Sequence, residues 1–303
     1  MKKISWVLFF WVVVLFYSCA VLTKSQIKNI NAVAVSAESY SNFPSEIIKK
    51  RADLVLEEKL IGSILLQPEQ IKKSIVKAQE NYLLQQQLAD TLDLSLQLIQ
   101  QYASLLRKLS STGYVENLKN NTDDLNENLG DLVKIANAKL PNKIPPNVGN
   151  AITKVIFLIG DKLTKIKQAK ALKEFIPIGD TLVKITVKNL VDALSADLPA
   201  LLASDKEKFI NTYTNNIFSN ENRVNSTSMS QYLSALNDYD NLELLRQECI
   251  GAANKLSIAH SKLNSNIRSK SDIKEIFQET QDLIVSVKDL FKTFRKLSSG
   301  EQT

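Results

Sequence analysis

The chain has 303 residues, of which 44% are hydrophobic and only 7% aromatic, with 8 Gly and 7 Pro. All-β domains need more aromatic and turn-forming residues, so this composition favours an all-α fold. The net charge of +6 is too small to indicate a nucleic-acid partner, and the sequence contains no zinc-finger, RNP or basic-helix motif.

Residues 1–18 have the features of a secretory signal peptide. Lys2 and Lys3 form a positively charged start, and residues 6–17 form an uncharged apolar run. A positive region followed by an apolar region of this length is typical of an export signal. We therefore expect the rest of the chain to lie outside the cytoplasm.

The apolar run ends at Ser18-Cys19-Ala20. A small residue directly before a cysteine resembles the processing site of bacterial lipoprotein precursors. That resemblance covers only about the first twenty residues, and it implies that Cys19 carries diacylglycerol and, after cleavage, a third acyl chain. Several acyl chains together anchor a protein firmly to a membrane. In this family, Ala20 rather than Asp after the cysteine implies sorting to the outer membrane if the cell has two membranes.

Two other interpretations of the N-terminus remain open. Residues 4–22 contain no charge, and a run of this length is long enough to stay as an uncleaved transmembrane anchor. Alternatively, the small residues around Cys19 form an ordinary cleavage site, which leaves an exported protein without an anchor. Each interpretation places the body of the chain outside the cytoplasm.

We interpret residues 19–43 as a lipidated tether, because residues 24–43 mix Ser, Asn, Ala and Val without a clear helical period. Residues 44–303 are predicted to form the helical bundle. A first helix is expected from Pro44, with Ser45 as its cap, to about residue 67. The prolines at 141–146 mark the clearest break, because proline cannot continue a helix. Together with the change in character after residue 203, this break divides the bundle into 44–139, 148–203 and 204–297.

The strongest helical pattern lies in residues 68–109. Its uncharged positions repeat in steps of four and three, which keeps one stripe on one side of an α-helix. The stripe comprises Ile71, Ile75, Ala78, Tyr82, Gln85, Ala89, Leu92, Leu96, Ile99, Ala103 and Leu106. A second neutral stripe comprises Leu84, Leu88, Thr91, Ser95, Leu98, Tyr102 and Leu105. Two stripes and one polar face indicate a helix that packs against several others.

Three later segments repeat this spacing, at 114–138, 229–267 and 272–297. The stripe of the 229–267 helix comprises Leu242, Leu245, Cys249, Ala252, Leu256, Ala259 and Leu263. We therefore predict an all-α, elongated multi-helix bundle with coiled-coil-like packing. The 68–109 and 229–267 helices, each of about 40 residues, would run along its length.

Residues 148–203 combine an apolar run at 155–159 with a cluster of lysines, and Pro177 and Gly179 are expected to split the segment. One interpretation is a buried helical hairpin with a solvated lysine face. The other is an apolar, basic hairpin that contacts anionic lipid or an acidic partner. The candidate contact residues for the second interpretation are Phe157, Lys162, Lys165 and Lys170.

The sequence shows no recognisable catalytic or metal-binding motif. The chain has one histidine, His260, whereas helical di-iron sites and zincins need at least two. We expect His260 to lie on the flank of its helix and Cys249 to be a small core residue. The chain also lacks a nucleophile elbow and a phosphate-binding glycine loop. We therefore expect no cofactor, no metal and no catalysis.

The sequence thus predicts a membrane-anchored, extracytoplasmic bacterial lipoprotein that acts as a non-catalytic helical scaffold or interaction module of the cell envelope. Its expected partners are membrane lipid, through acylated Cys19, and an unidentified protein, but not nucleic acid. The alternative is a membrane-active protein, similar to helical pore-forming toxins, that uses the 148–203 hairpin.

Overall fold

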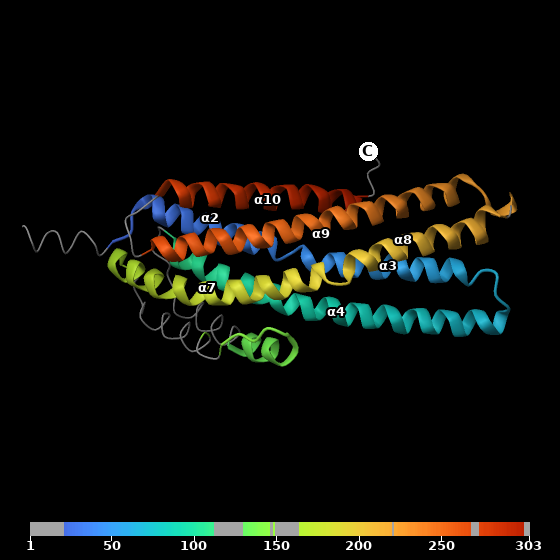
Figure 1. The fold of residues 1–303 in the computed structure, drawn as a ribbon, viewed down its shortest axis with the longest axis horizontal. Helices are drawn as coiled ribbons and strands as arrows, with labels where there is room; N and C mark the ends of the chain where they lie inside the picture. The colour runs from blue at the N-terminus through green and yellow to red at the C-terminus, as the bar shows by residue number, and fades with distance from the viewer. Residues whose placement is uncertain are drawn as a thin grey trace, which may run out of the picture.

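The computed structural model describes residues 21–111, 130–145, 148, 164–219, 221–267 and 273–299. These residues form an elongated helical bundle (Figure 1), and none of them lies in a β-strand. The all-α prediction is therefore confirmed for this part of the chain. Among the same residues, no helix is both long enough and apolar enough to span a membrane.

Two long helices run along the bundle, α4 (Pro68–Leu109) and α9 (Ser226–Asn266). They have 42 and 41 residues and point in the same direction (Figure 1). At 1.5 Å per residue each is about 60 Å long. The prediction of two long helices is confirmed, and both begin within three residues of the expected positions.

The other helices lie alongside these two in the opposite direction (Figure 1). One line consists of α2 (Lys24–Tyr40) followed by α3 (Pro44–Gly62). Another line consists of α7 (Lys165–Ser195) followed by α8 (Leu198–Tyr213). The last helix, α10 (Ile273–Ser299), packs on α9 and α2.

We call the end of the bundle where α2 begins and α9 ends the proximal end. The distal end holds the connection between α3 and α4 and the connection between α8 and α9 (Figure 1). The latter contains a π-helical turn, Thr214–Phe218, and a 3₁₀ turn, Glu221–Arg223. Residues 130–139 form a further short helix near the proximal half. Most of the helix expected at 114–138 lies outside the described residues.

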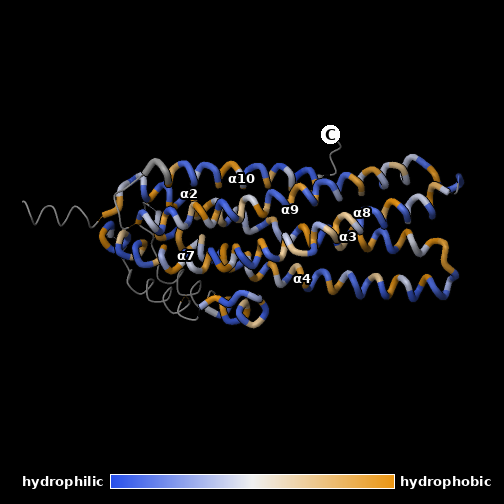
Figure 2. Tube along the Cα trace, in the orientation of Figure 1, coloured by the Kyte–Doolittle hydropathy of each residue, from blue (hydrophilic) through white to orange (hydrophobic). Residues whose placement is uncertain are grey.

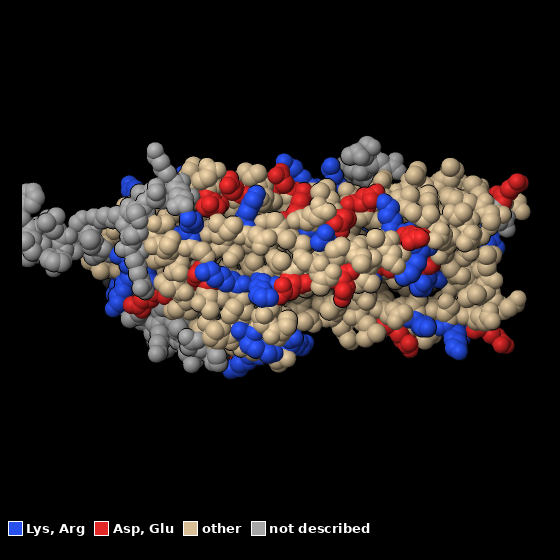
Figure 3. Space-filling view, viewed as in Figure 1, with Lys and Arg blue, Asp and Glu red and all other residues tan. Residues whose placement is uncertain are grey.

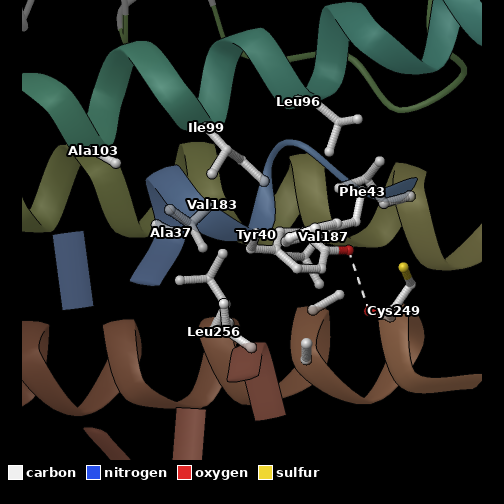
Figure 4. Close-up of a cluster of buried hydrophobic side chains, with 14 of the residues drawn as sticks. Ala37, Tyr40, Phe43, Leu96, Ile99, Ala103, Val183, Val187, Cys249 and Leu256 are labelled. Atoms are coloured by element: carbon white, nitrogen blue, oxygen red, sulfur yellow. Dashed lines mark hydrogen bonds between the residues drawn. The ribbon is translucent and has the colours of Figure 1, made fainter. Parts of the chain in front are cut away.

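The core of the proximal half lies between α2, α4, α7 and α9 (Figure 4). Tyr40 is fully buried there, and its hydroxyl donates a hydrogen bond to the backbone carbonyl of Cys249 at 3.2 Å. Burial raises the pKa of the Cys249 thiol well above its usual range. The prediction that Cys249 is a core residue is confirmed.

The predicted stripes are buried where several helices surround them. All members of the α9 stripe are buried, and the first α4 stripe is buried from Ala89 onward. In contrast, Ile75 of the first stripe and Leu84 and Leu88 of the second are exposed, so the prediction is wrong for these three. α4 contacts α2, α3 and α7. In Figure 1, α7 runs alongside the C-terminal half of α4, and α3 runs alongside its N-terminal half. The side that α7 covers further along is therefore open at Leu84 and Leu88.

The interpretation of residues 19–43 as a tether is wrong for 24–40, which form α2. Thr23 caps this helix by accepting a hydrogen bond from the backbone N–H of Gln26, whose side chain bonds back to Thr23. Ile30, Val33 and other apolar residues of α2 are buried in the bundle. Short side chains and buried polar residues such as Asn29 interrupt this apolar face, which hides its period in the sequence.

The next helix begins at Pro44, as expected, but it ends at Gly62 rather than near residue 67. Ser45 is buried within its first turn and does not cap it.

The expected split at Pro177 and Gly179 is also wrong, because α7 continues through both residues. A proline inside a helix is normally unfavourable by about 3 kcal/mol, but α7 is held on both sides of Pro177 by buried residues such as Phe175 and Leu182. Gly179 is needed for a different reason. A Cβ atom at this position would lie 2.0 Å from Cζ of Tyr102, so only glycine lets this ring approach the helix.

We expect Gly179→Ala to destabilise the fold by about 1–3 kcal/mol, because the Tyr102 ring must move. Gly251→Ala in α9 is the matched control, since a Cβ there meets nothing within 4 Å. It should instead stabilise the protein by about 0.5–1 kcal/mol through helix propensity. Urea unfolding of both variants checks this, and equal shifts of the midpoint would show that Gly179 has no packing role.

Candidate functional site: two buried polar clusters and an exposed apolar end

The first polar cluster joins α4, α7 and α9 through Tyr102, His260 and Asp180. The Tyr102 hydroxyl lies 2.6 Å from Nε2 of His260, and Nδ1 of His260 lies 3.3 Å from Oδ1 of Asp180. The Tyr102 ring stacks on Phe175, with 4.9 Å between the ring centroids. His260 is fully buried rather than on the flank of its helix, so that expectation is wrong.

The contacts assign the protons of this cluster. Burial, together with the charge of Asp180, raises the pKa of Tyr102 well above its usual range, so its hydroxyl keeps its proton. The two contacts of His260 are then both satisfied when its Nδ1 carries a proton. His260 accepts from the Tyr102 hydroxyl at Nε2 and donates to Asp180 from Nδ1.

The Asp180 carboxylate accepts hydrogen bonds from several further groups. The Ser261 hydroxyl lies 2.9 Å from Oδ1, and Asn264 and Lys184 donate to Oδ2 at 3.1 and 2.7 Å. Burial alone would raise the pKa of Asp180, but the hydrogen bonds from His260, Lys184 and Ser261 outweigh it and hold the pKa far below its usual range. Asp180 is therefore ionised at every physiological pH.

The order Asp180–His260–Tyr102 resembles that of an acid–base relay, but access decides what it can do. Tyr102 is 1% exposed and His260 is 0% exposed, so no substrate reaches them in this conformation. The cluster can therefore act only structurally, by holding α4, α7 and α9 in one arrangement. The sequence signal for it was the Tyr102 position within a buried stripe, combined with a Gly-Asp pair among the apolar residues at 175–183.

The second polar cluster lies in the distal half. It includes Gln85, the one strongly polar residue of the first α4 stripe. Arg51 of α3 contacts Oδ2 of Asp205 through Nε at 2.8 Å and Nη2 at 2.7 Å. Its Nη1 donates to Oε1 of Gln85 at 2.9 Å. Both charged residues are buried. Burial, with the charge of Asp205 as the next cause, raises the pKa of nearby Tyr239 above its usual range.

An open hollow of about 500 Å³ lies between α2 and α4. It is lined by polar side chains that include Glu38, Gln100 and Arg107. Its two charged residues pair with each other, since Nε of Arg107 lies 3.2 Å from Oε2 of Glu38. This ion pair leaves the hollow without a free charge for a ligand.

Large apolar side chains gather on the surface of the distal half. More than a third of those exposed among the described residues lie between 60 and 88. They comprise Leu60, Ile64, Leu65, Leu66, Ile75, Val76, Leu83, Leu84 and Leu88. Figure 3 shows uncharged side chains over much of the distal end, with acidic and basic groups along the lower edge where α4 lies. Large exposed apolar patches are common features of contact surfaces, and sequence reasoning missed this one.

The predicted site residues do not converge on these features. Lys165 and Lys170 lie exposed in the first two turns of α7, which is consistent with a solvated lysine face. Cys19, Phe157 and Lys162 lie outside the described residues.

Comparison with protein families, curated proteins and solved structures finds no match to this chain.

Replacing the Asp180 carboxylate tests the first cluster. Asp180→Asn should destabilise the fold at neutral pH by about 3 kcal/mol, because buried His260 and the partly buried Ser261 and Asn264 lose a charged acceptor. The folded-state pKa of Asp180 lies below its ordinary value of 3.8. Its contribution is therefore complete above about pH 5 and is lost as the pH falls through the folded-state value. Urea unfolding at neutral pH and near pH 3 should show the difference between wild type and variant shrinking on acidification, and a constant difference would contradict the assignment.

A double-mutant cycle tests the second cluster. Arg51→Met alone should cost about 3–5 kcal/mol, because it leaves the Asp205 charge buried without its main partner. Arg51→Met combined with Asp205→Leu should cost much less than the two single losses added together. Guanidinium unfolding of the four proteins gives the coupling energy, and simple additivity would show that the pair does not interact.

Proposed function

We propose that the protein is a lipid-anchored extracytoplasmic protein whose helical bundle serves as a non-catalytic interaction module or scaffold of the cell envelope. The observation that carries the proposal is the exposed apolar surface at the distal end. It lies on a bundle whose opposite end receives the chain from Cys19.

The arrangement of the ends supports this role. Only Ala20 separates Cys19 from the first described residue, Val21. A lipid on Cys19 would therefore hold the membrane within a few residues of the proximal end. The long helices extend about 60 Å from there, and the exposed apolar turn at residues 64–66 lies at the far end (Figure 2). An anchored rod of this kind presents its free end to partners away from the membrane.

The burial of the polar clusters supports a non-catalytic role, since Tyr102 and His260 are closed to solvent. The membrane-active alternative gains no support from α7, most of whose apolar side chains lie in the bundle core. The apolar run at 155–159 lies outside the described residues. We therefore retain the scaffold as the proposed function.

Metabolic labelling with a clickable fatty acid tests the anchor. Wild type and Cys249→Ala should both be labelled, because Cys249 is buried in the core. Cys19→Ala should lose the label and should no longer sediment with membranes unless the apolar N-terminal run remains attached. Equal labelling of Cys19→Ala and wild type would refute the lipoprotein proposal.

A further inference from the structure

The connection between α3 and α4 carries three consecutive exposed apolar residues, Ile64, Leu65 and Leu66. It lies at the extreme distal end of the bundle, where the trace is coloured as hydrophobic in Figure 2. Connections are usually polar because they face water. This turn therefore leaves apolar side-chain surface exposed to water in the folded protein.

Two of the three backbone N–H groups of this turn are hydrogen-bonded within the protein. The N–H groups of Ile64 and Leu66 donate to the carbonyls of Ile61 and Ser63 at 3.2 and 3.1 Å. The Asn216 side chain from the neighbouring π-helical turn also donates to the Ile61 carbonyl, at 2.9 Å. Entry into an apolar medium is costly mainly for unpaired backbone groups, so these bonds lower the cost of placing the turn there.

The composition of the turn favours lipid over a protein partner. Protein interfaces take most of their binding energy from Trp, Tyr and Arg, and leucine is under-represented among their strongest contacts. The turn at 64–66 offers only aliphatic side chains. Aliphatic groups gain free energy in any apolar medium in proportion to the area removed from water. A bilayer satisfies this requirement without a complementary shape.

The charges around the turn are compatible with a membrane surface. Lys72 and Lys73 are exposed in the first two turns of α4, and Glu69 partly offsets them. Lys59 pairs with Glu58 at 2.8 Å. The small positive excess predicts only a modest preference for anionic lipid, so the apolar turn itself supplies the main interaction.

We propose that residues 64–66 insert into the interfacial region of a lipid bilayer, so that the distal end is a membrane-docking tip. Combined with the anchor of the proposed function, on which this second step rests, the bundle would connect two bilayers. Insertion of the tip itself does not depend on lipidation, so the two proposals can fail separately.

The test places an environment-sensitive nitrobenzoxadiazole dye at the tip. The full chain carries Cys19→Ala and Leu65→Cys, and the remaining thiol, Cys249, is fully buried. The matched control is Leu83→Cys on the side of α4, because Leu65 and Leu83 are both 54% exposed. The probes are vesicles of phosphatidylcholine, with or without phosphatidylglycerol and with or without a nitroxide-labelled lipid.

We expect the dye at position 65 to shift its emission to shorter wavelength on addition of vesicles and to be quenched by the nitroxide lipid. The dye at position 83 should do neither. No change at position 65, or equal changes at both positions, would overturn the proposal. A blue shift at position 65 that is already present without lipid and grows with protein concentration would assign the tip to protein self-association instead.

A second measurement reads the connection of two bilayers. Wild-type protein reconstituted into one set of vesicles should cluster a second set, as followed by light scattering. Leu65→Asp should reduce this clustering by about tenfold, whereas Leu83→Asp should leave it unchanged. Protein that co-floats with the first vesicles without clustering the second would refute the docking tip and leave the anchor intact. Protein that fails to co-float would refute the anchor, and the dye at position 65 would still decide the tip.

Discussion

The structure depends on shielding the apolar stripes of two parallel helices, α4 and α9, from water along about 60 Å. Each carries an apolar stripe over much of its length, and no other helix of the described residues is as long. The chain meets this demand by placing shorter helices end to end, α2 before α3 and α7 before α8. Each junction must satisfy carbonyls at a helix end. Ser41 and Asn42 donate to the Glu38 carbonyl at one junction, and Arg246 donates to the Leu194 carbonyl at the other.

A bundle held only by repeated stripes tolerates sliding, because a shift of one helical turn replaces one set of apolar contacts with another. The two buried polar clusters remove this freedom. A shifted helix would separate Asp180 from His260 and Ser261, or Arg51 from Asp205, and leave buried polar or charged groups without these partners. Such a loss costs several kcal/mol, which is comparable to the whole stability of a typical domain. Each half of the bundle contains one cluster, so the alignment of neighbouring helices is fixed separately in each half.

The two halves of the bundle are not packed equally, and the two ends therefore differ in how much apolar surface they expose. In the proximal half, α10 adds a further helix on α9 and α2, and α4 is enclosed from both sides. In the distal half α8 packs on α3 and α9, which leaves one side of α4 and the turn before it in water. The apolar residues there keep 38–60% of their surface in water, so they stabilise the fold less than fully buried residues do. The same chain thus forms a well-enclosed half next to its N-terminal segment and a half with apolar surface at the opposite end.

The sequence by itself determined the fold class, both long helices, and most of their buried positions. Periodic spacing is a local property, and Cys249 or Leu96 needs only its own stripe to be assigned to the core. It did not reveal α2, whose short residues hide the period, or the continuity of α7 through Pro177. Only the tertiary structure decided which part of each stripe is covered. Leu84 and Leu98 occupy the same stripe, yet one is exposed and the other buried, because α7 covers only one of them. The same reason applies to Tyr102, His260 and Asp180, which lie far apart along the chain and meet only where three helices pack together.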